Sequence, residues 1–185
     1  MPDIVFYEGK PYNVAGVKGA GMFEPRSFGL KSMAKCSDCW RGYVCEYCVL
    51  KDRRFVLRGL RINLPDQADD ADEDLELFGV KPRHYKNGLF ERSYRGMNGP
   101  IEFTGGILLG MDFISKLYVH MGFHPAWKYQ KVYELILEKG RVVSAEDRSQ
   151  RMAELREEIS RESLTPKSSA EIAKWVETCF SLEYR

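Results

Sequence analysis

The chain has almost no net charge, because its 28 lysine and arginine residues are balanced by 27 aspartate and glutamate residues, which leaves +1. Nucleic acids and anionic membranes attract proteins through a large positive excess, and this sequence has none. We therefore expect neither nucleic acid nor a membrane as partner. Any recognition that uses charge must be local.

Long hydrophobic runs are also missing. No apolar stretch approaches the roughly 20 residues that a membrane-spanning helix needs. The first residues, Met-Pro-Asp-Ile-Val-Phe-Tyr-Glu, lack the basic and apolar regions of a secretion signal. There are five cysteines, an odd number that argues against a disulfide framework. We therefore expect a cytoplasmic protein whose cysteines are thiols or metal ligands.

Sequence motifs for catalysis are absent. There is no Gly-x-Ser-x-Gly motif, and the glycines within residues 16–21 do not match the Gly-x-Gly-x-x-Gly of dinucleotide sites. His120 and His124 have the spacing of two ligands on one side of a helix, but Gly122 and Pro125 disfavour a helix there. We expect no enzymatic activity, no catalytic residue and no cofactor.

Strand signals dominate the chain up to residue 145. Residues 40–50 and 55–62 are rich in aromatic and branched side chains and flank a charged turn, which predicts a hairpin. Residues 131–137 and 141–145 flank a Glu-Lys-Gly turn and predict a second one. These patterns favour a sheet built from antiparallel hairpins.

The period of the apolar residues changes after residue 145. Met152, Leu155 and Ile159 form a narrow helical stripe, and a capping box beginning at Ser168 predicts a second helix.

The predicted fold class is therefore α+β, with antiparallel hairpins forming a curved sheet followed by two C-terminal helices. A chain of 185 residues has the size of one domain. We expect a single domain at 1–185, with a β-rich body at 1–145 and the helices at 146–185.

Four cysteines lie within thirteen residues, as the pairs Cys36 with Cys39 and Cys45 with Cys48. Two such pairs are a common way to build a tetrahedral zinc site. Here only five residues separate the pairs, fewer than in common zinc ribbons. If residues 43–50 form a strand, the second pair points to opposite faces and cannot share one ion. We expect thiols and no bound metal, with a four-cysteine zinc site as the alternative.

The most biased segment of the chain is residues 66–76. Its seven carboxylates are Asp66, Asp69, Asp70, Asp72, Glu73, Asp74 and Glu76. They do not match a calcium loop, because Leu75 stands where that loop needs glycine. A solvated loop is one interpretation. The other, which we adopt as a hypothesis, is a partner-binding site whose closely spaced carboxylates steer a basic protein partner.

Several segments resemble a group of small bacterial cytosolic proteins. They are Cys-Trp-Arg-Gly-Tyr-Val at 39–44, Pro-Ile-Glu-Phe-Thr-Gly-Gly-Ile-Leu-Leu-Gly at 100–110, Tyr-Val-His-Met-Gly-Phe at 118–123 and Glu-Asp-Arg-Ser at 146–149. Some members of this group look like immunity proteins of secreted polymorphic toxins. The resemblance spans about residues 28 to 155, and it implies a protein that binds a toxin without any defined catalytic residue.

We therefore expect a non-catalytic cytosolic binding protein, an immunity protein that binds and neutralises a cognate protein toxin. Aromatic residues at Trp40, Tyr43, Trp127 or Tyr129 are candidate anchors for that partner. The alternative is a zinc-stabilised adaptor or nucleic-acid-binding module built on the four cysteines.

Overall fold

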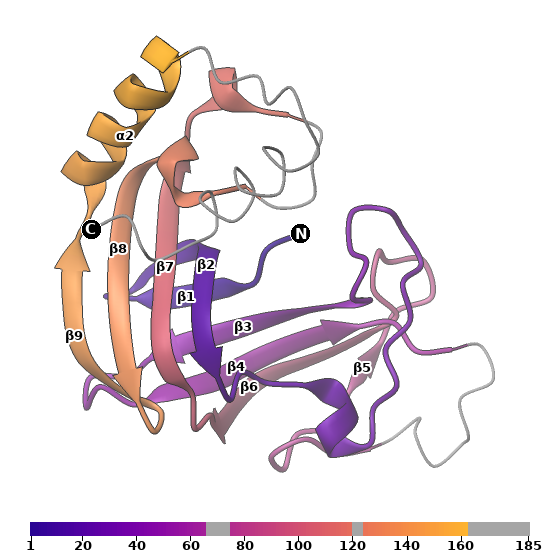
Figure 1. Cartoon of the computed structure of the whole chain (residues 1–185). Coiled ribbons are helices and arrows are strands. Elements are labelled where there is room, and N and C mark those ends of the chain that lie inside the picture. The colour runs from indigo at the N-terminus through magenta and orange to yellow at the C-terminus, as the bar shows by residue number, and fades with distance from the viewer. Residues whose placement is uncertain (66–74, 120–123, 163–185) are drawn as a thin grey trace.

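The computed structural model describes residues 1–65, 75–119 and 124–162, and its main element is one sheet of nine strands (Figure 1). The strands are β1 (Ile4–Tyr7), β2 (Lys10–Ala20), β3 (Tyr43–Val49), β4 (Phe55–Ile62), β5 (Arg83–His84), β6 (Arg92–Pro100), β7 (Thr104–Phe113), β8 (Tyr129–Glu138) and β9 (Arg141–Asp147). The 3-10 helices are η1 (Pro25–Phe28), η2 (Ser115–Leu117) and η3 (Ala126–Lys128), and the α-helix is α2 (Ser149–Glu162).

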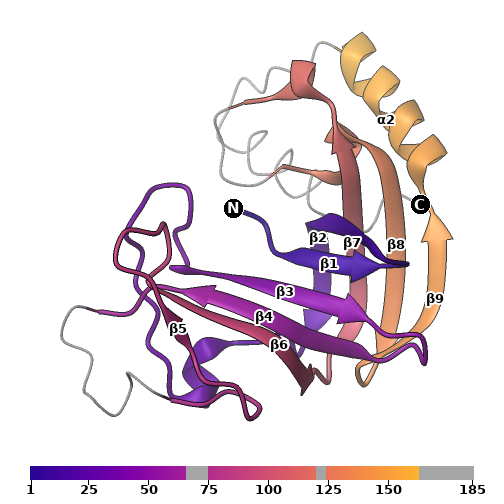
Figure 2. The ribbon, with the colours of Figure 1, turned by 180° about the vertical axis from the view of Figure 1, so that it is seen from behind.

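The order of the strands, β5-β6-β4-β3-β1-β2-β7-β8-β9, divides the sheet into two halves. We name β5, β6, β4, β3 and β1 the open half, and β2, β7, β8 and β9 the covered half. Figures 1 and 2 show the strands of one half running across those of the other. The corner lies in β2, whose pairing with β7 shifts register between Val14 and Gly16. A bulge of this kind bends a strand and increases its twist.

The sheet also closes on itself at one end, where the β3–β4 turn meets the β8–β9 turn. The Phe55 amide donates a hydrogen bond to the Gly140 carbonyl at 2.8 Å, and the Val142 amide donates to the Arg53 carbonyl at 2.9 Å. Gly140 has a φ of +73°, and a Cβ there would lie 2.1 Å from the Ile101 carbonyl oxygen. Only glycine fits this corner without displacing the backbone.

The main hydrophobic core fills the space between the two halves. Tyr47, Leu57 and Tyr94 reach it from the open half, while Ile107 and Leu135 reach it from the covered half. Alternate residues of a strand point to opposite faces, so each strand gives every second side chain to this core. The core residues therefore define an inner face and an outer face for each half of the sheet.

A second core buries the outer face of the covered half. Leu108 on β7 and Val132 on β8 pack there with Trp127 of η3 and Met152 of α2. Strands buried on both faces are apolar at consecutive positions, as the Ile-Leu-Leu run at 107–109 is. The helix α2 and η3 thus cover the outer face of the covered half.

The predicted fold class is wrong. The sheet is mixed, because β1 pairs in parallel with β3, Ile4 opposite Glu46, and only one α-helix lies within the described ranges. Hairpin patterns pair each strand with its neighbour in the sequence. The free backbone edge of β1 instead accepts a strand that returns after a long connection, and side-chain periodicity does not encode that pairing. The second predicted helix, from Ser168, lies outside the described residues.

Candidate partner-binding site

The loop before β3 presents a tryptophan to solvent. Trp40 is 82% exposed, more than any other large apolar side chain in the described part of the chain. Single exposed apolar residues are common and need no special explanation. Trp40 differs because the residues on both sides of it are fastened to the body of the protein. We therefore treat this loop, residues 36–42, as the first element of a candidate site.

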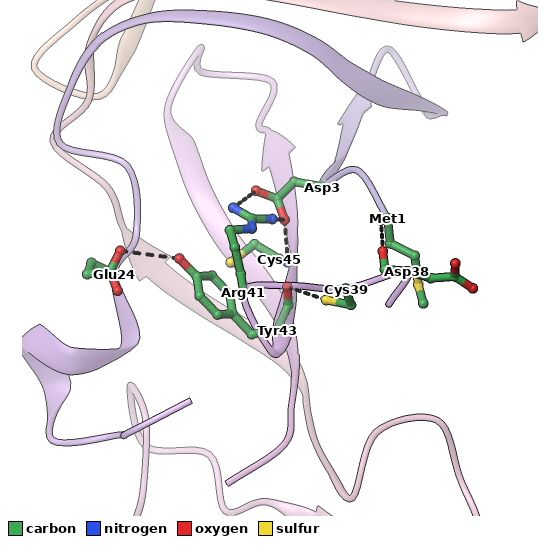
Figure 3. A network of polar contacts seen from close by, with 8 residues as sticks. All are labelled: Met1, Asp3, Glu24, Asp38, Cys39, Arg41, Tyr43 and Cys45. Atoms are coloured by element: carbon green, nitrogen blue, oxygen red, sulfur yellow. Dashed lines mark hydrogen bonds and ion pairs between the residues drawn. The ribbon is translucent and has the colours of Figure 1, made fainter. Parts of the chain in front are cut away.

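A buried carboxylate holds the loop through the next residue, Arg41. The Asp3 carboxylate accepts hydrogen bonds from both terminal nitrogens of Arg41, at 2.7 and 3.1 Å, and from the Cys45 amide at 2.8 Å (Figure 3). Asp3 is only 6% exposed. A two-pronged pair between a guanidinium and a carboxylate fixes both direction and distance. The segment before β1 is thereby tied to the loop and to β3.

Arg41 also stacks on an aromatic ring of β3. Its guanidinium carbon lies 4.7 Å from the centre of the Tyr43 ring, and the Tyr43 hydroxyl donates to Glu24 at 3.2 Å. Burial lowers the pKa of Arg41, but the hydrogen bonds and the charge of Asp3 outweigh burial and raise it. Burial raises the pKa of the Tyr43 hydroxyl. Arg41 therefore stays charged, and Tyr43 stays neutral, at any physiological pH.

The residue before Trp40 is fixed as firmly. The Cys39 thiol donates to the Tyr43 carbonyl at 3.2 Å, and the Gly42 amide donates to the Cys39 carbonyl at 2.9 Å. Gly42 has a φ of +72°, and a Cβ there would lie 2.3 Å from the Met33 carbonyl oxygen. A residue with a side chain would push the loop off the body. Figure 3 also shows the Met1 amino group in contact with the Asp38 carbonyl.

A second loop, residues 85–91, lies against the first and is joined to it by Asn63. The Asn63 side-chain amide donates to the Leu89 carbonyl at 3.1 Å and its oxygen accepts from the Glu91 amide at 2.9 Å. The Asn63 amide donates to the Gly42 carbonyl of the first loop, and the Asn63 carbonyl accepts from the Met33 amide ahead of that loop. Asn63 is 1% exposed, so these bonds are sheltered from water.

Apolar contact completes the joint between the two loops. Cys39 and Phe90 pack on Val44 of β3 in a small core of their own. Leu89 and Tyr85 of the second loop remain exposed at the surface. The two loops together therefore present Trp40, Leu89 and Tyr85 on a rigid base. We name residues 36–42 and 85–91 the loop pair.

The four cysteines of the zinc alternative do not converge. β3 is a strand, as predicted, and Cys45 faces the main core, while Cys48 lies on the other side of the strand. Cys39 and Cys36 belong to the small core instead. Burial raises the pKa of the Cys45 thiol well above its usual value. Within the described ranges, no three histidine, cysteine or acidic side chains are placed to hold a metal ion.

The acidic segment is only partly covered by the structure. Asp66, Asp69, Asp70, Asp72, Glu73 and Asp74 lie outside the described residues. Glu76 is described, and its carboxylate lies 3.8 Å from the Lys81 ammonium group in an exposed ion pair. Its role in steering a basic partner remains a prediction. The loop pair is a different surface, built from other residues.

The histidine pair of the sequence analysis also falls partly outside the described residues, since His120 is not covered. His124 packs against the rings of Phe113 and Tyr118, with ring centres 4.7 and 5.5 Å away. Burial lowers the pKa of the His124 imidazole. Its surroundings in the described part of the chain are aromatic, which suits a packed neutral histidine.

The sequence named one of the exposed anchors and missed the residues that support it. Of the four aromatic candidates, Trp40 is exposed, whereas Tyr43, Trp127 and Tyr129 are buried. Asp3 and Asn63 were not singled out, because a lone polar residue near a strand end has no distinguishing pattern. Asp3 and Asn63 hold the loops through hydrogen bonds made in buried positions, and the burial of a polar residue is known only from the fold.

Comparison of the chain with protein-family models, curated proteins and solved structures gave no match. Among the described residues, no helix is long and apolar enough to cross a membrane. The function is therefore inferred from the geometry and charge of the loop pair and its surroundings.

Proposed function

We propose that this protein is a non-catalytic cytoplasmic binding protein, an immunity protein that neutralises a cognate protein toxin by covering part of its surface. The loop pair is the contact site in this proposal. The observation that carries it is a tryptophan 82% exposed on a loop that an ion pair to the buried Asp3 carboxylate holds in place. Residues of this kind contribute most to protein interfaces.

The rigidity of the loop pair supports this role. A flexible loop loses conformational entropy when it binds, which reduces affinity, whereas a loop already fixed in the free protein avoids that cost. The Asp3–Arg41 pair holds the residue after Trp40, and the bond from the Cys39 thiol to the Tyr43 carbonyl holds the residue before it. The Asn63 side chain holds the second loop. Trp40, Leu89 and Tyr85 are then exposed on a held backbone, where each can contact the toxin.

The proposal is tested with the toxin domain encoded beside this chain, purified and titrated by calorimetry. We expect a complex with a dissociation constant in the micromolar range or tighter. Trp40→Ala should raise that constant about 30-fold, which corresponds to about 2 kcal/mol for an interface anchor. Trp40 is too exposed for its removal to weaken the fold, so thermal unfolding of the variant should match that of the original chain.

The matched control is Val143→Ala, at an exposed position of β9 in the covered half. It should bind as the original chain does.

A variant with the carboxylates of residues 66–74 replaced by their amides tests the acidic segment. Association with the toxin that is slower, and no longer depends on salt concentration, would confirm steering. If no complex forms with the adjacent toxin domain, the proposed function is wrong.

A further inference from the structure

Four arginines project from the outer face of the open half. They are Arg58 and Arg61 on β4, Arg83 on β5 and Arg95 on β6, and we name them the arginine face. Figure 2 views this side of the sheet, and no helix crosses in front of β3 and β4 there. Arg58, Arg83 and Arg95 are exposed, and the Arg61 side chain is 34% exposed.

Strand register places Arg61, Arg83 and Arg95 on one side of the sheet, and the register shift between Leu57 and Gly59 brings Arg58 to the same side. Arg61 pairs with Ser93, and Ser93 pairs with Arg83, so the three residues form a row across β4, β6 and β5. Adjacent strands are about 4.8 Å apart, which puts Arg61 and Arg83 about 10 Å from each other along the row. Arg95 is two residues from Ser93 and shares its side.

Aromatic rings and a hydroxyl hold the guanidinium groups in place. The guanidinium carbon of Arg58 lies 4.9 Å from the centre of the Phe6 ring, and that of Arg61 lies 5.5 Å from the Phe90 ring. The Arg95 Nε donates to the Ser93 hydroxyl at 3.3 Å. Stacked guanidinium groups keep their edges available for hydrogen bonding.

Within the part of the chain that the structure describes, few carboxylates compensate the positive charge of this face. Within the described residues, one ion pair involves these four arginines. It joins the Arg61 Nε to the Glu46 carboxylate at 3.6 Å. The same Arg61 Nε has no hydrogen-bond partner. By contrast, Arg148 at the outer face of the covered half pairs with Glu134 and Glu146 at 2.7 and 2.6 Å. Four cations thus share one face of a chain whose net charge is +1.

The arginine face is continuous with the loop pair. Phe90, on which Arg61 stacks, belongs to the second loop and packs against Cys39, the neighbour of Trp40. A partner seated on Trp40 and Leu89 would therefore extend over Arg61 first. The apolar anchors and the cations form one surface.

We propose that the arginine face docks a carboxylate-rich protein surface, beside the apolar anchors of the loop pair. Planar guanidinium groups match carboxylates with two parallel hydrogen bonds, and arginine is enriched at protein interfaces. On the arginine face itself, single-stranded nucleic acid is disfavoured because it needs open aromatic rings for base stacking, whereas the Phe6 ring lies under Arg58 and Phe90 is buried. The open rings of Trp40 and Tyr85 belong to the loop pair beside it. The inference rests on the proposed function in that it takes the occupant to be a protein.

The first experiment measures the binding of two fluorescent probes of similar charge, a peptide of about ten glutamates and an oligothymidylate of about ten nucleotides. We expect the peptide to bind and the double variant Arg61→Gln, Arg83→Gln to weaken it about tenfold, as expected from the loss of two charge-assisted contacts. The matched control is Arg26→Gln, an exposed arginine on η1, away from the sheet. It removes one charge and should leave binding nearly unchanged.

Tighter binding of the oligothymidylate than of the peptide, or no binding of either probe, would overturn the inference. The second experiment repeats the toxin titration with the double variant. A complex that Trp40→Ala weakens and the double variant does not would remove the arginine face from the interface and leave the proposed function standing. Absence of any complex, with peptide binding intact, would remove the proposed toxin and leave the arginine face as a carboxylate site.

Discussion

The two halves of the sheet share an inner core and differ on their outer faces. In the covered half, the outward side chains of β7 and β8 include Leu108 and Val132, which pack under α2 and η3. In the open half, the outward side chains of β4 and β6 include Arg61 and Arg95, which no helix of the described residues covers. The same alternation along a strand thus yields a second core in one half and a charged surface in the other.

The difference between the two outer faces shows which side chains can serve a binding site without a loss of stability. The covered half uses both faces of β7 and β8 to hold the fold, so the buried side chains of these two strands are not available to a partner. The open half uses its inner face for the main core, and on its outer face Val44 packs in the small core while Arg58 and Arg95 stay exposed. Surface binding is therefore inferred for the open half and for the loops at its end.

The largest expected effect is in the second core. Leu108→Ala removes a fully buried side chain that packs beneath α2 and η3, and it should lower the free energy of unfolding by about 3 kcal/mol. Arg95→Ala, the equivalent outward position of the open half, should change it by less than about 0.5 kcal/mol. Urea unfolding of both variants measures the difference. Equal losses would contradict the division into a covered and an open half.

A somewhat smaller effect is expected at the ion pair that fastens the first loop. Asp3→Ala leaves the Cys45 amide and Arg41 without their acceptor, and should cost about 2 kcal/mol, because Arg41 is half exposed and can regain water. Hydrogen exchange at the Cys45 amide should become faster. Asp52→Ala, which removes an exposed ion pair with Arg54, is the control and should leave stability unchanged.

The smallest expected effect is on the free energy of unfolding at alkaline pH. It should arise from the open half and not from the covered half. The inner face of β3 carries Cys45 and Tyr47, whose pKa values burial raises well above the usual range. β7 carries Ile107 and Leu109 there, which do not titrate. A group with a raised pKa in the folded state stabilises the fold at low pH, and this contribution is lost once the group ionises in the unfolded chain.

For Cys45 that loss begins near pH 8.5, and for Tyr47 near pH 10. We expect the free energy of unfolding to fall by about 1 kcal/mol between about pH 8 and 9.5, as measured by urea titration. Cys45→Ala should make that fall smaller, although the variant starts from a lower stability. An unchanged pH slope in this variant would show that Cys45 is not the buried group that we describe.

The hairpins were predictable because each is local. β3 with β4 and β8 with β9 pair as the sequence indicates, through side-chain alternation and a turn of suitable residues. The parallel pairing of β1 with β3 and the pairing of β2 with β7 join segments far apart in the chain. Backbone groups make these pairings, and every residue carries the same ones, so the sequence pattern does not specify them.

The candidate site was predictable only in part. Trp40 was a candidate anchor because it is aromatic, yet the same reasoning named Trp127, which is buried under the helix. Exposure depends on which elements pack over a residue. The arginines of β4, β5 and β6 also lie too far apart in sequence to form a charge run, and only their register brings them together.

The sequence by itself determined the balance of charge, the local hairpins and the opposite directions of Cys45 and Cys48 on β3, because these follow from composition and from a two-residue period. The tertiary structure decided which strands meet, which outer face receives a helix and which polar residues become buried. Those outcomes depend on contacts between distant segments. The free energy of burying a polar or charged group is set by these contacts and not by the local sequence pattern.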